Sequence, residues 1–468
     1  MKLKRPFTEE DWDSTPKPVR EYVEQLEATV FELLDQVAKL TKRVEDLENR
    51  LNKNSQNSNK PPSSDPPFNK PKKPVQKKKG KKRKKGGQPG HKAHKQALLV
   101  PNKKILVMPV QCSCGSTHFD ETKSKPFYTH QVIELPPINM DVYHYILHKA
   151  DCSICGQKVK AIIPRANRTG YGPRLSAAIA ELSGTYGNSR GTVQEICRNI
   201  LNFHISTGAI QKVVDRASMA IEPAYNQIGK TARTSLVNYI DETSWFQSGK
   251  LRWLWTMTNE KIAYFKIHPN RSKEAFHTLI EDWNGILVSD GYGVYKKWPG
   301  SRQSCLAHLI REAKNLAERE DESVQLFGKN ILELLRRLCH FAEKPPSKKQ
   351  WTDCYSQLIT FIILYESGTD DAGKLARRLG REMENLWTFL KHDGVEPTNN
   401  RAERAIRFGV LWRKRSKGTQ SDKGDRWVER ILSLKQTCRI KAISSFYILE
   451  QALVDFFNEQ DPDLNWIA

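Results

Sequence analysis

Two short apolar runs in the middle of the chain each end on an aspartate: 236–241 (LVNYID) and 285–290 (GILVSD). Their length and their content of Val, Ile and Leu are typical of buried strands. Between them lie two runs rich in aromatic and aliphatic residues, 251–257 (LRWLWTM) and 262–267 (IAYFKI), and a helical stretch at 273–283. We therefore predict three strands, a crossover helix and a fourth strand in a mixed sheet, with both aspartates at the ends of neighbouring strands.

A third acid, Glu403, lies in the helical-looking segment 399–407 (NNRAERAIR). Aspartates at the ends of two neighbouring strands, facing a glutamate from a helix, would form an all-oxygen pocket of the kind that Mg²⁺ or Mn²⁺ prefers. Two such ions can activate the attacking oxygen and stabilise the leaving oxygen of a phosphodiester displacement. The strand pattern and the pocket together predict a ribonuclease-H-like core that holds two ions through Asp241, Asp290 and Glu403. Each acid taken alone has the alternative of an exposed residue without a role.

The distance between the second and third acids requires an inserted unit. Glu403 follows Asp290 by 113 residues, too many for a simple connection from a strand to a helix. The apolar runs 331–338 (ILELLRRL) and 358–364 (LITFIIL) have the composition of buried helices. We therefore predict an all-helical insertion before the third acid.

Two other acids compete with Glu403 for the third position. Asp393 and Glu396 precede it, but the glycine and the proline beside them indicate a loop. Glu403 instead lies four residues before Arg407 on one helical face, so its carboxylate and the guanidinium can face the same phosphate. Glu242, next to the first aspartate, would point to the opposite side of the strand and is not included.

The net charge favours a nucleic-acid partner. The chain has 468 residues and a formal charge of +23, and residues 66–119 contain fourteen Lys, one Arg and no acid. The run 77–85 (KKKGKKRKK) is expected to bind DNA phosphates without reading sequence; the alternative is a solvated tail. The predicted DNA contacts in this run are Lys81, Lys82, Arg83, Lys84 and Lys85.

A second basic cluster lies in and after the segment that carries the third acid, with Trp412 among its residues. A basic run with an aromatic side chain can hold a DNA backbone or stack on a displaced base. The alternative is a solvated helix face. The predicted DNA contacts of this cluster are Arg404, Arg407, Arg413, Lys414 and Arg415.

The first fifty residues carry a heptad repeat, in which apolar residues fall at a positions every seven residues from Val23 to Leu51 and at d positions from Leu26 to Leu47. A β-branched residue at a with Leu at d favours a parallel two-stranded coiled coil and hence a homodimer or a larger assembly. The alternative is a helix that packs on its own domain. The following stretch, 52–95, is polar, rich in Pro and highly charged, so we expect a disordered linker.

Two cysteine pairs predict one structural Zn²⁺ site. Cys112 and Cys114, and then Cys152 and Cys155, are each followed by a Gly, which allows the tight turn of a zinc knuckle. The intervening segment is rich in Val, Ile and Tyr, so a small β-rich zinc ribbon is expected. His118 is an alternative ligand to Cys112, and unliganded cysteines are the alternative to the whole site.

Cys305 and His308, at the start of a predicted helix, also have a spacing that could bind a metal ion. The alternative is that the two side chains only pack at the start of that helix. Nine cysteines scattered over the chain favour thiols over a disulfide framework.

Helical patterns at 173–182, 192–201 and from Ser206 or Thr207 onward are compatible with a helix-turn-helix module or with plain helical packing. The chain lacks an apolar run long enough to span a membrane, so a cytoplasmic protein is expected.

Several motifs occur in a fixed order along the chain, and they are 57–65 (NSNKPPSSD), 86–92 (GGQPGHK), the four cysteines, 241–243 (DET), 289–292 (SDGY), 305–308 (CLAH) and 399–407 (NNRAERAIR). In these motifs and over nearly its whole length the chain resembles the DDE transposases of the insertion-sequence sixty-six (IS66-like) family. Two local departures are Phe408, where the family often has a proline, and the close spacing of Cys112 and Cys114.

The resemblance implies a function and a set of partners. Asp241, Asp290 and Glu403 would be the catalytic acids of an enzyme that cleaves double-stranded DNA at element ends and joins the freed 3′ ends to target DNA. The protein would act in the bacterial cytoplasm, associated with the nucleoid, and accessory transposition proteins are possible partners. The alternatives are a metal-dependent nuclease of the same fold and a non-enzymatic, zinc-containing DNA-binding dimer.

The expected organisation is therefore an α/β multidomain chain with its catalytic core in two parts. The expected segments are a coiled coil (1–51), a basic linker (52–100), a zinc-binding domain (101–168), a helical DNA-binding region (169–233), a ribonuclease-H-like core (234–319 and 396–440), a helical insertion (320–395) and a C-terminal helical segment (441–468).

Overall fold

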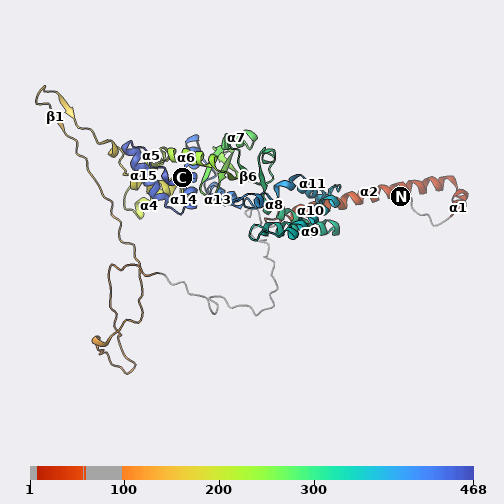
Figure 1. Ribbon diagram of the computed structural model, residues 1–468, viewed down its shortest axis with the longest axis horizontal. Helices are drawn as coiled ribbons and strands as arrows, with labels where there is room; N and C mark the ends of the chain where they lie inside the picture. Colours follow the sequence, from red (N-terminus) through yellow and green to blue (C-terminus); the bar gives the residue numbers. More distant parts are fainter. Residues whose placement is uncertain (1–7, 56, 59–96) are drawn as a thin grey trace.

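The computed structural model describes residues 8–55, 57, 58 and 97–468, with a five-stranded sheet at its centre (Figure 1). The strands are β3 (Val237–Gln247), β4 (Lys250–Thr258), β5 (Ala263–His268), β6 (Ile286–Ser289) and β7 (Arg302–Ser304). Their order in the sheet is β5-β4-β3-β6-β7. The first three pair antiparallel, while β6 and β7 continue the sheet in parallel with β3. The predicted mixed sheet is thus confirmed, with the crossover helix α7 (Lys273–Ile280) between β5 and β6.

Two details of the sheet differ from the prediction. β3 continues six residues past Asp241, so the prediction that this strand ends there is wrong. The cause is a two-residue hairpin turn at Ser248 and Gly249, which have φ values of 48° and 77° and bring residues 242–247 into register with β4. β7 is an additional strand that consists of three polar residues and exists because it pairs with β6.

Side chains on β3 alternate between two buried helical layers. Tyr239 packs in a cluster with α8 (Leu306–Ala317) and the insertion helices, whereas Ile240 packs with α6 (Glu222–Thr234) and α7. Further along the strand, Trp245 contacts the cluster that contains α13 (Asn400–Ser416). Because successive side chains point to opposite faces, Asp241 shares the face of Tyr239 and Trp245.

Helix α14 (Asp422–Ile440) covers the edge of the sheet formed by β5. Three side chains spaced four residues apart on this helix accept hydrogen bonds from backbone N–H groups of β5: Thr437 from Ala263 at 3.2 Å, Ser433 from Phe265 at 3.0 Å and Glu429 from Ile267 at 2.6 Å. An edge strand with unpaired N–H groups is a site for unwanted pairing with other chains. The helix removes that possibility at β5.

The stretch between β7 and α13 is helical, as predicted. Its apolar side chains form one cluster with Tyr239, Ile286 and Val288 of the sheet. This cluster fixes the inserted helices to the strands that carry the acids. The helices of the insertion are α9 (Glu322–His340), α10 (Lys348–Tyr365), α11 (Asp371–Glu382) and the short α12 (Thr388–Lys391).

A helical layer precedes the sheet in the sequence and contacts the C-terminal helix. Ser206 accepts a hydrogen bond from the backbone N–H of Ala209 at 3.1 Å and so caps the third predicted helix, as one of two expected caps. The helices of this layer are α3 (Pro173–Ser183), α4 (Arg190–Asn199), α5 (Thr207–Ala220) and α6; α15 (Ser445–Asn458) packs against α3 and α5.

The N-terminal region is a short helix, α1 (Glu9–Ser14), followed by the 35-residue helix α2 (Lys17–Leu51). In Figure 1, α2 projects away from the insertion helices α10 and α11, and its heptad side chains from Leu26 to Leu51 are exposed. Just beyond it, residues 52–55, 57 and 58 were expected in the linker but are folded: Asn57 is 4% exposed and donates hydrogen bonds to Glu318 at 2.9 Å and to the Asn52 carbonyl at 3.0 Å. This segment therefore docks against the end of α8.

The predicted zinc segment has little regular structure among the described residues. It contains one antiparallel hairpin, formed by β1 (Lys149–Asp151) and β2 (Lys158–Lys160), and two single turns of 3₁₀ helix (Glu121–Lys123 and Arg165–Asn167). Figure 1 shows β1 at the opposite end of the molecule from α2. In the parts of the chain that the structure describes, no helix has the length and apolar character needed to cross a membrane.

Candidate active site

Asp241 and Asp290 lie at the same level of two adjacent parallel strands. The register of β3 and β6 pairs Val237 with Ile286 and Tyr239 with Val288. Two residues further along each strand are Asp241, on β3, and Asp290, immediately after β6. The two aspartates are therefore neighbours across the strand pair, as the prediction required.

The surroundings of Asp241 are strongly negative. Burial raises the pKa of Asp241 well above its usual value, and the charges of Glu242, Asp290 and Glu403 raise this pKa further. Its Oδ1 accepts a hydrogen bond from the backbone N–H of Glu242 at 2.9 Å. Among the described residues, the ion pairs around the site involve Glu242 and Glu403, and neither aspartate forms one. Glu242 and Glu403 are thus each paired with an arginine, while the two aspartates have no ion-pair partner among the described residues.

Asn399 fixes Glu403 relative to the sheet. Its side-chain amide donates a hydrogen bond to the carbonyl oxygen of Ile240 at 2.8 Å, one residue before Asp241. Its backbone N–H donates to the Cys305 sulfur at 3.1 Å, and the backbone N–H of Cys305 donates to the carbonyl oxygen of Ser289 at 2.9 Å. These hydrogen bonds therefore connect the start of α13 to β3 just before Asp241 and, through Cys305, to the end of β6 just before Asp290. Glu403 lies in the first turn of α13.

Asn399 was not identified from the sequence. It occupies the position before the first turn of α13, where an Asn is usually a helix cap. Here its side chain makes no cap hydrogen bond and instead reaches the strand. That partner lies 159 residues away in the sequence, so no local pattern indicated the contact.

The two acids that compete with Glu403 have other surroundings. Asp393 is exposed, and Glu396 forms an ion pair with Arg401 at 2.5 Å while its backbone N–H donates to the Tyr239 hydroxyl at 2.7 Å. The charge of Glu403, after those of Glu242 and Asp290, raises the pKa of Asp241, while the carboxylate oxygens of Asp241, Asp290 and Glu403 do not all lie within 4.8 Å of one another. These surroundings favour Glu403 as the third acid.

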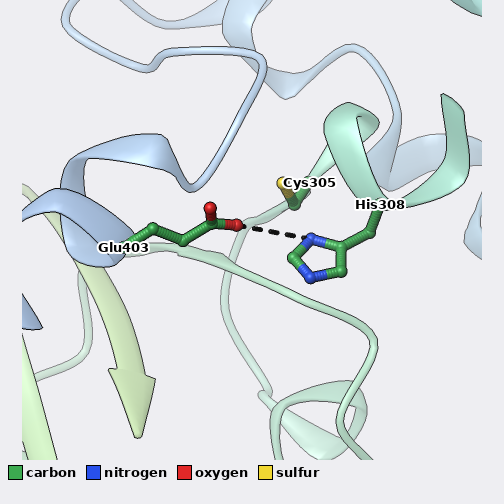
Figure 2. A group of neighbouring side chains, drawn as sticks. All are labelled: Cys305, His308 and Glu403. Atoms are coloured by element: carbon green, nitrogen blue, oxygen red, sulfur yellow. Dashed lines mark ion pairs between the residues drawn. The ribbon is translucent and has the colours of Figure 1, made fainter. Parts of the chain in front are cut away.

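The carboxylate of Glu403 faces two side chains of α8. Its Oε1 lies 3.8 Å from Nδ1 of His308 (Figure 2). The same oxygen lies 3.4 Å from a terminal nitrogen of Arg311. Burial and the charge of Arg311 lower the pKa of His308. Cys305 lies beside this pair and is 2% exposed, and its burial raises the thiol pKa to about 11.

Glu242 serves a different network on the opposite face of β3, where the sequence placed it. Its carboxylate accepts hydrogen bonds from the Tyr295 hydroxyl and from Nε of Arg271, the latter at 2.8 Å. The guanidinium of Arg271 lies over the Tyr292 ring, 4.0 Å from its centroid, and the Tyr292 hydroxyl donates to the Arg271 carbonyl at 2.8 Å. These contacts hold the loop that follows Asp290 against β3. No local sequence pattern indicated these contacts.

The predicted DNA-contacting side chains have different surroundings. Arg404, Arg407, Lys414 and Arg415 are exposed along α13. Arg413 instead donates to Thr243 and Ser244 of β3 and so holds α13 to the sheet. Trp412 is 8% exposed within the core, so the suggestion that it stacks on a DNA base is wrong. Residues Lys81, Lys82, Arg83, Lys84 and Lys85, with the motifs 59–65 and 86–92, lie outside the described residues.

The structure forms both predicted cysteine turns but keeps them apart. Gly115 and Gly156 have φ values of +90° and +71°, and hydrogen bonds from Cys114 and Cys155 lower the pKa of Cys112 and Cys152, respectively. Within the described residues, however, no three of the four cysteines bring their sulfur atoms within 4.8 Å of one another. Each pair has the local shape of a zinc knuckle, and the single four-cysteine site remains a prediction.

Comparison with known proteins agrees with the geometry of the core. The model of the family described as "Transposase IS66 family" matches residues 169–426, more than half of the chain. A second family model, described as a family of unknown function (DUF6444), matches residues 14–97. A curated relative, the uncharacterized protein y4jO of Sinorhizobium fredii, is 25% identical over 180 residues, which are 38% of this chain and 54% of the relative. The chain therefore spans about half the length of that relative, and by its family match it belongs to the IS66 family of transposases.

Proposed function

We propose that this protein is a DDE transposase that cleaves DNA at the ends of a mobile element and joins the freed ends to target DNA. The observation that supports this most strongly is that Asp241 on β3, Asp290 at the end of β6 and Glu403 on α13 lie near enough for the charges of Asp290 and Glu403 to raise the pKa of Asp241. Burial and the charges of Glu242, Asp290 and Glu403 raise the pKa of Asp241, and among the described residues neither aspartate forms an ion pair, whereas Glu403 pairs with Arg311. Such a cluster is costly for a protein that does not bind cations with it.

The donor set fits divalent metal ions. Carboxylate oxygens are the ligands that Mg²⁺ and Mn²⁺ prefer, and bound cations would neutralise the charge of the two aspartates, which form no ion pair among the described residues. Asp241, Asp290 and Glu403 would hold two such ions. When bound, these ions would supply charge stabilisation for the attacking and leaving oxygens of a phosphodiester displacement.

The residues of the chain position the acids and the DNA. Asn399 keeps Glu403 beside the two aspartates through its hydrogen bonds to β3 and to Cys305. The exposed guanidinium groups of Arg404 and Arg407 lie on the same helix as Glu403 and are suited to bind backbone phosphates. In the proposed reaction, water attacks a phosphodiester at each element end and releases a 3′-hydroxyl. That hydroxyl then attacks target DNA at the same site, without a covalent intermediate on the protein.

The proposed domain organisation follows the sheet order. Three antiparallel strands continued by two parallel ones, with acids at the level where β6 ends, support a ribonuclease-H-like core interrupted by the helices α9 to α12. The exposed apolar seam of α2 supports dimerisation through a parallel coiled coil. The helices α3 to α6 and the basic residues of the chain are the proposed contacts to double-stranded DNA.

One structural Zn²⁺ ion is part of the proposal. Cys112, Cys114, Cys152 and Cys155 form two knuckle turns whose positive-φ glycines and N–H···S hydrogen bonds are suited to a tetrahedral thiolate site. Binding would require the two turns to approach each other. Zinc content should then fall by one equivalent in Cys155→Ser and stay unchanged in Cys339→Ser, which changes a cysteine of the helical insertion.

The experiment that tests the function is incubation of purified protein with Mg²⁺ and DNA that carries the terminal inverted repeats of the element. A transposase nicks these ends and also joins ends that have been cut in advance. A nuclease of the same fold cleaves without joining. A DNA-binding dimer without enzymatic activity gives neither product.

A further inference from the structure

A second cluster of metal-binding groups lies beside the proposed catalytic acids. Cys305, His308 and Glu403 each offer one ligand atom, and these three atoms lie within 4.8 Å of one another. Across the described residues, no other group of three His, Cys, Asp or Glu side chains meets this condition. Figure 2 shows the three side chains converging from the start of α8 and from α13.

Two of the three ligands are held in place by the backbone. Cys305 immediately precedes α8, its backbone N–H binds the Ser289 carbonyl oxygen at 2.9 Å, and its sulfur accepts the N–H of Asn399 at 3.1 Å. His308 lies three residues later, on the same side of the helix, because residues three apart are neighbours on a helix surface. The backbone therefore places both side chains near each other before any ion arrives.

The third ligand can move, and a side-chain cation already sits beside it. Glu403 has 36% of its side chain exposed, and its Oε1 lies 3.4 Å from the guanidinium of Arg311 and 3.8 Å from the His308 ring. The same guanidinium lies 3.5 Å from Nδ1 of His308. Arg311 thus occupies the place beside both groups that a bound cation would take, and it is 24% exposed, which leaves it room to move outward.

The chemistry of this donor set differs from that of the three carboxylates. A thiolate and an imidazole select Zn²⁺ and other thiophilic ions, whereas Mg²⁺ prefers oxygen ligands only. Three protein ligands also leave one position of a tetrahedral ion open. Glu403 belongs to both sets, so an ion held by Cys305 and His308 would compete for the carboxylate that the catalytic site needs.

We propose that Cys305, His308 and Glu403 form a binding site for a thiophilic divalent cation such as Zn²⁺, and that its occupancy inhibits Mg²⁺-dependent DNA cleavage by engaging Glu403. On binding, the sulfur of Cys305 loses its proton to solvent and the guanidinium of Arg311 withdraws. The binding site stands on the geometry of the three side chains. The inhibition rests on the proposed function.

The binding site is tested by counting ions on the full-length protein. Co²⁺ is the probe, because its thiolate complexes absorb in the near ultraviolet, and Zn²⁺ displacement gives the stoichiometry. The wild type should bind one equivalent more than Cys305→Ser and His308→Gln. Cys354→Ser, which changes a buried cysteine of α10 outside the cluster, should match the wild type. Equal stoichiometry in the wild type and in a folded His308→Gln protein would overturn the site, even if Cys305→Ser failed to fold.

The inhibition is tested by titrating Zn²⁺ into cleavage reactions that contain a fixed excess of Mg²⁺, with each variant normalised to its own activity without Zn²⁺. The half-inhibitory Zn²⁺ concentration should rise in Cys305→Ser and His308→Gln by more than the ~10–100-fold that loss of an outer-shell partner costs a metal site. Unchanged inhibition would show that Zn²⁺ acts elsewhere and would refute this half of the proposal. Absence of Mg²⁺-dependent cleavage in every protein would instead refute the proposed function, while the ion count still decides the site.

Discussion

The side-chain amide of Asn399 donates a hydrogen bond to the backbone carbonyl of Ile240 at 2.8 Å. This bond joins the residue directly before α13 to the strand position directly before Asp241. Because Asn399 is 1% exposed, water cannot replace the bond when it is lost. The distance between Glu403 and the aspartates therefore depends on a residue that touches neither metal nor DNA in the proposed mechanism.

Replacing Asn399 with Ala should weaken both stability and metal use. Removing one partner of a buried hydrogen bond costs about 1–3 kcal/mol, so the free energy of unfolding should fall by that amount. Cleavage should need more Mg²⁺ for half-maximal rate, because Glu403 is no longer held beside Asp241. Chemical denaturation and a Mg²⁺ titration of the cleavage rate measure the two effects. Asn400→Ala, one residue further on, is the matched control, and an equal Mg²⁺ requirement in both variants would argue against a positioning role.

The cluster of carboxylates around Asp241 should lower the free energy of unfolding of the protein when metal is absent. Asp241→Asn removes one of the mutually repelling carboxylates, so the free energy of unfolding in metal-free buffer should rise by on the order of 1–2 kcal/mol. Added Mg²⁺ should stabilise the wild type much more than the variant, because an ion that binds only the folded state shifts the unfolding equilibrium. Thermal unfolding with and without Mg²⁺ measures both effects, with the exposed Asp393→Asn as control. A less stable Asp241→Asn protein would mean that the cluster is not repulsive.

The hydrogen bond between Tyr295, in the loop after Asp290, and Glu242 should stabilise the fold. Tyr295 is fully buried and donates its hydroxyl hydrogen to the Glu242 carboxylate. Tyr295→Phe keeps the ring and loses a hydrogen bond to a charged group, which is worth about 1.5–3 kcal/mol. Tyr447→Phe, on the exposed surface of α15, should change the free energy of unfolding by less than about 0.5 kcal/mol. Urea denaturation of the two variants gives the comparison, and equal stabilities would remove the structural role assigned to this pair.

Glu429 should make stability depend on pH in a defined window. Burial raises its pKa to about 7, so the folded state favours the protonated carboxyl. The stabilisation that the folded state gains from the protonated carboxyl is fully present below the usual Glu pKa. It is lost as the pH rises through the pKa of Glu429 in the folded protein, so the free energy of unfolding of the wild type should fall between about pH 4.5 and pH 7. Glu429→Gln keeps an oxygen acceptor for the Ile267 N–H and should lose on the order of 3 kcal/mol less over that window.

The comparison for Glu429 is Glu384→Gln, an exposed acid paired with Lys391. Its unfolding profile should follow that of the wild type across the same pH range. If the Glu429→Gln profile also followed the wild type, the buried carboxyl would not be the group that titrates.

The parts of the fold that the sequence predicted are those that local patterns encode. The apolar runs gave β4, β5 and β6, and periodic apolar residues gave the insertion helices. The extension of β3 beyond Asp241 depends on a hairpin turn that brings in a partner strand, and β7 exists only because β6 lies beside it. Neither carries a strand pattern of its own.

The same distinction applies to the site. The acids were identified because they follow apolar runs or lie on a helical face next to an arginine. Asn399 and Tyr295 were missed because their partners lie 159 and 53 residues away. Trp412 was misjudged because its basic neighbours suggested a surface, while the ring itself packs into the core between α13 and the sheet.

In the proposed mechanism, Asp241, Asp290 and Glu403 act as one catalytic set on DNA. The most direct measurement scores nicking of terminal-repeat DNA and joining of pre-cut ends by the wild type, Asp290→Asn and Glu403→Gln in the presence of Mg²⁺, with DNA binding measured in parallel and Glu396→Gln as the control acid. Asp290→Asn and Glu403→Gln should lose both reactions and still bind DNA, while Glu396→Gln should retain both. Joining of pre-cut ends by the Asp290→Asn protein at the wild-type rate would rule out this catalytic set.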